Sequence, residues 1–426
     1  MTPSTTTSKS ARSSKRSLGK TTATLLTAAM ILGTGLFVSL GATAAEAGSG
    51  ILIAMIIGGV ICLATGISAA QVGINYPVEG GTFIWTRQFG YPTISFVAGC
   101  SYILEGILGL AIVALGFATY SAQIIPGLSI PLTASIALVV VAGLNILGIS
   151  PASKVMIGIF FVNVAFLALY VAFAVPSVQA KNLTPIFGDG IMTVLAGASI
   201  FFWTWGGFQR TAIMANEMKE PRTTIPFAIV AGLTVVAIIF LIVAGVTLGV
   251  LGADAMGQND IPLFDGAVKV IGVWGGSMIL GLAWLSFFGE MVGDLLATAK
   301  VEHAMGKVHE LPHWLACLNR RFKSPQCALL MLTIVGVALI YLVPLRQLMP
   351  VANAGTLIWY AATNFAALKL QKKQRLAWPI ISWLGIAACF GLFFSLPLWS
   401  VAATAGFLAF LAAIRWLLIR IKIRPA

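Results

Sequence analysis

Apolar segments of about 20 residues follow one another along almost the whole chain, separated by short polar stretches. A helix needs about 20 apolar residues to cross roughly 30 Å of hydrocarbon. The pattern therefore predicts an all-α polytopic membrane protein with about twelve spans. The predicted spans are residues 22–45, 49–73, 92–120, 129–149, 154–176, 190–215, 224–251, 268–305, 326–343, 347–369, 377–396 and 399–420.

Charge is scarce and unevenly placed. Charged residues make up 9% of the chain, against about 25% in a soluble domain. The net charge of +13 could suggest nucleic acid as a partner. With both termini in the cytoplasm, however, nearly all of the 26 basic residues fall in cytoplasmic segments, as the positive-inside rule requires. The exceptions are Lys181, Lys269, Arg346 and Arg210. Topology thus explains the charge, no nucleic-acid partner is expected, and a multi-pass plasma-membrane location is predicted.

Two glycine pairs interrupt predicted spans. The first span contains "ILGTGLF" with Gly33 and Gly35, and the sixth contains "FFWTWGGFQR" with Gly206 and Gly207. Glycine costs a helix about 1 kcal/mol relative to alanine, and freed backbone groups inside lipid are tolerated only within protein or beside a polar cavity. The alternative is close helix packing, which small residues permit. Interruptions at matching places in two sets of five spans favour an inverted-repeat transporter.

These interruptions suggest a ligand. A half-helix that begins after Gly33 presents free N–H groups and a positive dipole end, which suit a carboxylate. Carbonyl groups freed before Gly206 would accept hydrogen bonds from an ammonium group, and an amino acid carries both. Trp203 and Trp205 either line the side-chain pocket or pack in the core. The predicted substrate-binding residues are Gly33, Thr34, Gly35, Leu36, Phe202, Trp203, Thr204, Trp205 and Gly206.

Four stretches, in this order along the chain, resemble the amino acid, polyamine and organocation superfamily of permeases. They are "ILGTGLFVSLG" (31–41), "YPVEGGTFIWTRQFG" (76–90), "FFWTWGGFQRTAIMANEMKEPRTTIP" (201–226) and "AKVEHAMGKVHELP" (299–312). The resemblance implies a five-plus-five inverted repeat with two trailing helices and alternating access. It also implies backbone recognition of an amino acid at spans one and six, and coupling to protons, sodium or exchange.

The predicted organisation follows from the spans and the resemblance. Residues 1–21 are rich in Ser, Thr and basic residues and are predicted to form a disordered cytoplasmic tail. Residues 22–176 form the first repeat, 190–370 the second, and 377–420 the trailing helices. A secretory signal ending at "ATAAEA" (42–47) is an alternative for the N-terminus, although its apolar run is long for one.

Ionisable groups within spans are functional candidates. Glu105 lies in "YILEGILG", which is similar to the L-E-Y of cationic amino acid transporters of the superfamily. Asn163 stands where some proton-coupled relatives carry lysine, and Ser286 is the one hydroxyl available for a sodium site in span eight. We therefore expect Glu105 or Glu290 to carry a coupled proton. The alternative is that the acids pair with Arg210 or line a vestibule. The proton-coupling candidates are Glu105, Glu290 and Asp294.

Cysteines and histidines give a weaker signal. The five cysteines are odd in number and lack paired spacing, so no disulfide is predicted. All three histidines and two cysteines fall within residues 303–327, as His303, His309, His313, Cys317 and Cys327. A metal site is the alternative to a solvated cytoplasmic loop, but Pro312 interrupts any helix that would align the ligands. We expect neither a metal nor a cofactor.

Enzyme motifs do not occur in the sequence: there is no P-loop, no G-x-S-x-G and no H-E-x-x-H. The sequence predicts a secondary active transporter of amino acids that works by alternating access, with proton-coupled uptake or exchange. A polyamine or organic-cation permease and a non-transporting amino-acid sensor are the alternatives.

Overall fold

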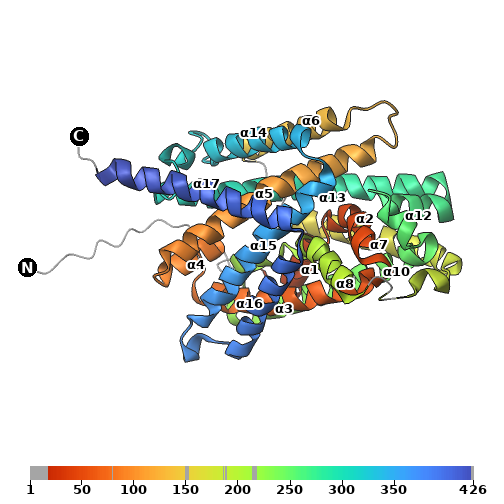
Figure 1. Ribbon diagram of the computed structural model, residues 1–426, viewed down its shortest axis with the longest axis horizontal. Helices are drawn as coiled ribbons and strands as arrows, with labels where there is room; N and C mark the ends of the chain where they lie inside the picture. Colours follow the sequence, from red (N-terminus) through yellow and green to blue (C-terminus); the bar gives the residue numbers. More distant parts are fainter. Residues whose placement is uncertain are drawn as a thin grey trace, which may run out of the picture.

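The computed structural model describes residues 18–78, 80–148, 153–185, 187, 190–213 and 218–423 (Figure 1). Most of the predicted tail, residues 1–17, lies outside the described residues. The first half comprises α1 (Lys20–Ile31), α2 (Gly35–Ala47), α3 (Ile51–Asn75), α4 (Gly81–Gln88), α5 (Pro92–Ser121), α6 (Ile130–Ile146) and α7 (Ser153–Ala174).

The second half continues the helical pattern. It comprises α8 (Ile191–Phe201), η4 (Phe202–Trp205), α9 (Phe208–Ile213), α10 (Pro221–Leu251), α11 (Ala253–Gly257), α12 (Pro262–Ile271), α13 (Val273–Lys307), η6 (His313–Ala316), α14 (Gln326–Leu342), α15 (Leu345–Leu368), α16 (Pro379–Ser395) and α17 (Leu398–Ile423). Among the described residues one isolated β-bridge, between Leu18 and Met218, is present.

Six helical segments of the described chain are long and apolar enough to cross a membrane, judged by length and composition. They are Gly35–Asn75, Pro92–Ser121, Ser153–Ser177, Pro221–Leu251, Val273–Lys307 and Leu398–Leu417. The remaining apolar helices are shorter, and α6, α14 and α16 belong to this group. The protein is therefore an all-α polytopic membrane protein.

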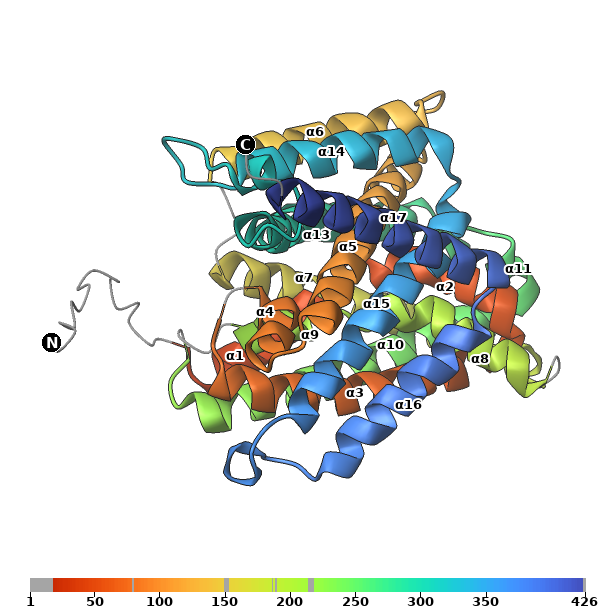
Figure 2. The same cartoon turned by 60° about the vertical axis from the view of Figure 1, so that its left-hand side comes forward.

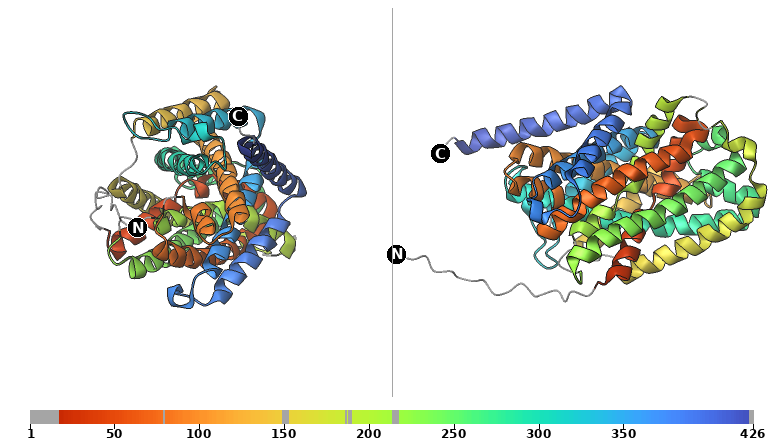
Figure 3. Two further views of the ribbon diagram at one scale, coloured as in Figure 1. Left: turned by 90° about the vertical axis from the view of Figure 1, so that its left-hand side faces the viewer. Right: turned by 90° about the horizontal axis from the view of Figure 1, so that it is seen from below.

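The interrupted helices lie inside the bundle. Helix α1 packs against α10, α2 against α8, and α9 against α3, while the long α5 contacts both α13 and α15 (Figure 2). Helices α6 and α14 lie side by side at one edge, and α17 crosses α15 and α5 (Figure 2). Helices α3 and α10 run alongside each other, as the right-hand view in Figure 3 shows. Both interruptions are thereby enclosed by protein, as freed backbone groups in a membrane require.

The end of the predicted tail is ordered. Helix α1 begins at Lys20, and the Leu18 carbonyl accepts a 2.8 Å hydrogen bond from the Lys219 N–H. Residues 18–21 therefore belong to the folded part, because a tertiary contact with the segment before α10 fixes them.

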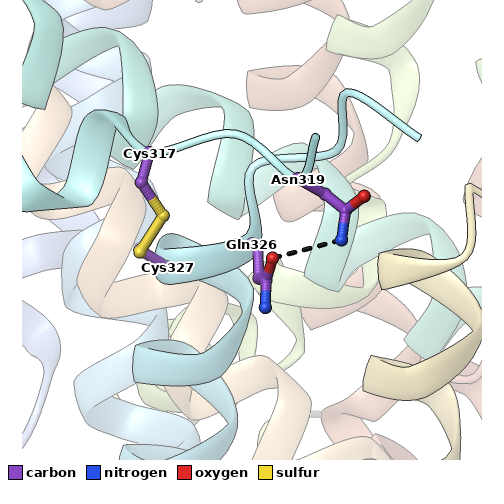
Figure 4. The surroundings of a disulfide bond; sticks show 4 residues. All are labelled: Cys317, Asn319, Gln326 and Cys327. Carbon is purple, nitrogen blue, oxygen red and sulfur yellow. Dashed lines mark hydrogen bonds between the residues drawn. A yellow bond between two sulfur atoms is a disulfide. The ribbon is translucent and has the colours of Figure 1, made fainter. Parts of the chain in front are cut away.

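The prediction of no disulfide is wrong. Cys317, in the loop after α13, and Cys327, in the first turn of α14, form a disulfide bond with 5.7 Å between their Cα atoms (Figure 4). The Asn319 side chain donates a 3.1 Å hydrogen bond to Gln326 in the same loop. Folding of this loop brings the two cysteines together, which a separation of ten residues does not reveal. The other three cysteines are buried and free.

The predicted solvated loop is likewise only partly a loop. His303 lies on α13 and is buried, whereas the rings of His309 and His313 stack 4.8 Å apart after the helix. No group of three or more His, Cys, Asp or Glu side chains in the described part of the chain is placed to hold a metal ion.

Candidate functional site at two interrupted helices

Both predicted helix interruptions are present. In the first apolar segment, helix α1 ends at Ile31 and helix α2 begins at Gly35. In the sixth apolar segment, helix α8 ends at Phe201, the 3₁₀ turn η4 follows, and helix α9 begins at Phe208. Gly207 has a φ of +97°, a left-handed conformation that glycine adopts without a steric penalty. The glycines therefore mark true breaks in the two helices.

The same glycines also allow close packing, so the two interpretations both hold. A Cβ atom on Gly35 would lie 2.8 Å from the Cα of Thr204, and one on Gly207 would collide with the Met30 carbonyl. The start of α2 thus rests on η4, and the turn after η4 rests on α1. The two breaks face each other because no side chain separates them.

The free backbone donor at the start of α2 is occupied by a side chain of the protein itself. The Thr34 N–H donates a hydrogen bond to the carboxylate of Glu290 on α13. A Cβ on Gly33 would collide with the same carboxylate, so the missing side chain makes room for it. The positive end of α2 favours an anion, and the anion present here is a side chain of the protein. The expected binding of a substrate carboxylate at this point stays a prediction. The hydroxyl of Thr34 is buried without a hydrogen-bond partner among the described residues.

The break in the sixth segment is stabilised by a residue that the sequence analysis missed. Asn353 on α15 accepts a 2.6 Å hydrogen bond from the Trp203 N–H and donates a 2.9 Å bond to the Ile200 carbonyl. The Gly206 N–H donates to the Trp203 carbonyl at 2.9 Å, so that carbonyl is not the free acceptor expected from the sequence. An asparagine within the apolar "LMPVANAG" was the available signal, because intramembrane amides bond across helices.

All three predicted acids gather around Arg210 of α9. Asp294 forms an ion pair with Arg210, so the pairing alternative holds for this acid. Glu105 instead accepts a 3.0 Å hydrogen bond from the indole N–H of Trp203. Three carboxyl groups and one guanidinium group thus share the space between the breaks. Such a site suits a positively charged group or a proton.

Small cavities connect these groups. One of about 50 Å³ is lined by Glu105, Trp203, Arg210, Asp294 and Thr298, among others, and one of about 30 Å³ is lined by several of the same residues together with Gly35, Thr204 and Glu290. A water molecule needs about 10–15 Å³ of such volume. The cavities can therefore each hold a few waters.

A third cavity, of about 40 Å³, lies between α1, α7 and α13. It is lined by Gly33, Asn163, Ser286 and Glu290, among others. The Asn163 side chain donates a 3.0 Å hydrogen bond to Ser286, so the two residues weighed for ion coupling contact each other. Glu290 lies between this cavity and the breaks.

One of the two tryptophans lines a cavity and the other packs in the core. Trp203 lines both cavities beside Glu105, whereas Trp205 is buried against Phe201 and Phe240. Phe202 packs on Tyr360 of α15, and Leu36 is fully buried. Of the predicted substrate residues, Gly35, Trp203, Thr204 and Gly206 border the cavities between the breaks. Thr34 reaches the site through its backbone.

The profile of the amino acid permease family matches residues 18–418. The chain belongs to this family. This amino acid permease is a transporter and not an enzyme, and it belongs to the superfamily that its sequence resembles. The match covers both interruptions and every acidic residue of the site.

Relatives of the permease cover nearly its full length. It is 29% identical to an uncharacterized transporter of Mycobacterium tuberculosis, over 92% of this chain and 89% of the relative. It is 27% identical to a branched-chain amino acid permease of Bacillus subtilis, over 85% and 82% of the two chains. A methylthioribose transporter of Bacillus subtilis is 24% identical, over 91% of each chain.

Proposed function

We propose that this permease is a secondary active transporter that carries amino acids by alternating access, with uptake or exchange coupled to protons. In this proposal its twelve spans form two inverted five-helix repeats, residues 22–176 and 190–370, followed by two trailing helices at 377–420. Both termini face the cytoplasm of a cell whose plasma membrane holds the protein. The family and the relative named for branched-chain amino acids support this class of substrate.

The hydrogen bond from Thr34 to Glu290 is the observation that carries the proposal. The start of α2 favours an anion, and in this proposal the carboxylate of the substrate takes the place of Glu290 at that donor. One buried polar atom beside the site, the Gln209 amide nitrogen, has no hydrogen-bond partner among the described residues. Buried polar groups in native proteins nearly always have partners, so this nitrogen favours a polar ligand.

Proton coupling follows from the competition for one donor. An ionised Glu290 is attracted to the positive end of α2, and a neutral one much less. Protonation therefore weakens the bond to Thr34 and frees the donor for the carboxylate of the substrate. One proton on Glu290 would accompany each substrate. Glu105 is the second candidate, because it borders the same cavities.

A thermal-shift screen of the purified permease tests substrate recognition. We expect some of the 20 standard L-amino acids to raise the melting temperature, while their decarboxylated amines do not, because the amines lack the group that replaces Glu290. A shift with amines and none with amino acids would reject the proposal.

Proteoliposomes test the coupling. Uptake of a labelled amino acid that passed the screen should rise with an inward proton gradient in the wild type and lose this dependence in Glu290→Gln. Glu46→Gln is the matched control, because Glu46 is exposed at the end of α2. Gradient-independent uptake by the wild type, unchanged in Glu290→Gln and in Glu105→Gln, would contradict proton coupling through these acids.

A polyamine or organic-cation permease is the second candidate function. It is favoured by the excess of carboxyl groups over the one guanidinium group of Arg210. In that case the amines of the screen would bind. A non-transporting amino-acid sensor would bind amino acids but show no exchange of labelled for unlabelled amino acid in proteoliposomes.

A further inference from the structure

Polar side chains recur at every fourth position along α13. They are Ser286, Glu290, Asp294, Thr298 and Glu302. Each step of four residues advances about 6 Å along the helix and turns about 40°. The row therefore winds slowly around α13, from the helix breaks toward the end marked by Lys307.

The first four members of the row contact the functional site. Ser286 bonds to Asn163, Glu290 accepts from Thr34, and Asp294 pairs with Arg210. Thr298 borders the 50 Å³ cavity that also contains Glu105 and Asp294. The cavity thus extends along α13 to one helical turn before Glu302.

Glu302, the last residue of the row, has no partner in the described part of the chain that would explain its burial. Its exposed fraction is 0%, and neither carboxyl oxygen has a hydrogen-bond partner among the described residues. Glu310, eight residues later, is also buried, but Arg87 and Arg415 both pair with it. A buried ionised carboxylate without a partner is strongly unfavourable. A second group must therefore neutralise Glu302.

No hydrogen bond from a neighbouring group reaches the Glu302 carboxyl group in the described part of the chain. Elements that pack against this end of α13, and α13 itself, carry other titratable groups, and none of them forms a hydrogen bond to Glu302. These groups are Arg87 on α4, Cys100 and Tyr102 on α5, His313 on η6, and Lys300, His303 and Lys307 on α13. A proton bound to the carboxyl group is the remaining means of neutralisation.

We propose that Glu302 is a proton-binding site, and that the α13 row conducts protons between the Lys307 end of the helix and Glu290. The O–H bond of Glu302 breaks as one forms on a water beside Thr298, and a proton arriving from the Lys307 end restores the carboxyl group. Waters in the 50 Å³ cavity and in the 30 Å³ cavity, which share Glu105 and Asp294 in their walls, relay the proton onward to Glu290. The direction of this transfer rests on the proposed proton coupling, whereas proton binding by Glu302 does not.

Infrared pH titration tests the proton site without any substrate. The full-length permease in lipid nanodiscs should show the C=O stretching band of a protonated carboxylic acid, and Glu302→Gln should lose part of it. Glu46→Gln is the matched control and should keep the full band, since Glu46 is exposed to solvent. An identical band in wild type and Glu302→Gln, in protein shown to be folded by its melting temperature, would overturn the site.

Proton flux tests the route. Proteoliposomes loaded with a pH-sensitive dye receive the 20 standard amino acids as one mixture, and we expect Glu302→Gln to reduce the resulting acidification at least tenfold. Exchange of labelled for unlabelled amino acid at equal pH should stay within twofold of the wild type. Unreduced acidification, or an equal loss of exchange, would overturn the route. If the wild type carried no amino acid, the proposed function would fail, and the infrared result would still decide the role of Glu302.

Discussion

The backbone N–H of Thr34 donates a hydrogen bond to the carboxylate of Glu290, which lies 256 residues further along the chain. This bond joins the break in the first helix to the middle of α13, and it places an internal carboxylate where a helix N-terminus attracts an anion. In the proposed function the carboxylate of the substrate replaces Glu290 at this donor, so the bond must open before the substrate binds. Its geometry leads to the first prediction.

Gly33→Ala should disturb this bond, because the added Cβ would collide with the Glu290 carboxylate. We expect Glu290 to leave Thr34 and the pH dependence of amino acid binding to weaken severalfold, with a thermal shift measured across a pH series as the readout. Gly289→Ala is the matched control, since its Cβ meets no atom within 4 Å in the same cavity. Equal pH profiles for the two variants would contradict the prediction.

The ion pair of Arg210 with Asp294 should be strongly coupled. Their side chains are 22% and 15% exposed, so removal of either partner leaves a charge with little solvation. We expect Arg210→Met and Asp294→Leu each to destabilise the fold, and the double variant to be less destabilised than the sum, with a coupling energy of about 2 kcal/mol. Denaturant unfolding in detergent measures the cycle. Additive effects would show that the pair contributes no mutual stabilisation.

Gly207→Ala should lower stability by at least about 2 kcal/mol, since alanine disfavours a positive φ and its Cβ would collide with the Met30 carbonyl. Gly281→Ala on α13 provides the comparison. A Cβ there meets open space, so we expect this substitution to be neutral or slightly stabilising, as alanine favours helix. Melting temperatures of the two variants give the test, and an unchanged value for Gly207→Ala would contradict the close approach of the two breaks.

Cysteine labelling should reveal one disulfide in the isolated protein. We expect a thiol reagent to modify three cysteines after denaturation without a reductant, and five after reduction, as counted by mass spectrometry. The three reactive positions should be Cys62, Cys100 and Cys389. Modification of Cys317 or Cys327 before reduction would contradict the bond between them.

The sequence by itself determined the class of fold and the positions of the breaks. Apolar segments long enough to cross a membrane predict helices, since only helices and closed barrels satisfy every backbone group in lipid. Gly33, Gly35, Gly206 and Gly207 marked both interruptions because glycine weakens a helix wherever it occurs. Glu105, Glu290 and Asp294 could be identified from the sequence because an ionisable group is rare and costly within an apolar membrane span.

The contacts between groups on different helices depend on how the chain packs. The occupant of the Thr34 donor, the amide of Asn353 at the second break and the pairing of Cys317 with Cys327 all depend on contacts between segments. Trp203 and Trp205 are two residues apart in one helical turn, yet one borders the cavities and the other packs in the core. Local sequence fixes helix propensity and polarity, whereas the partner of a buried polar group depends on how distant helices pack.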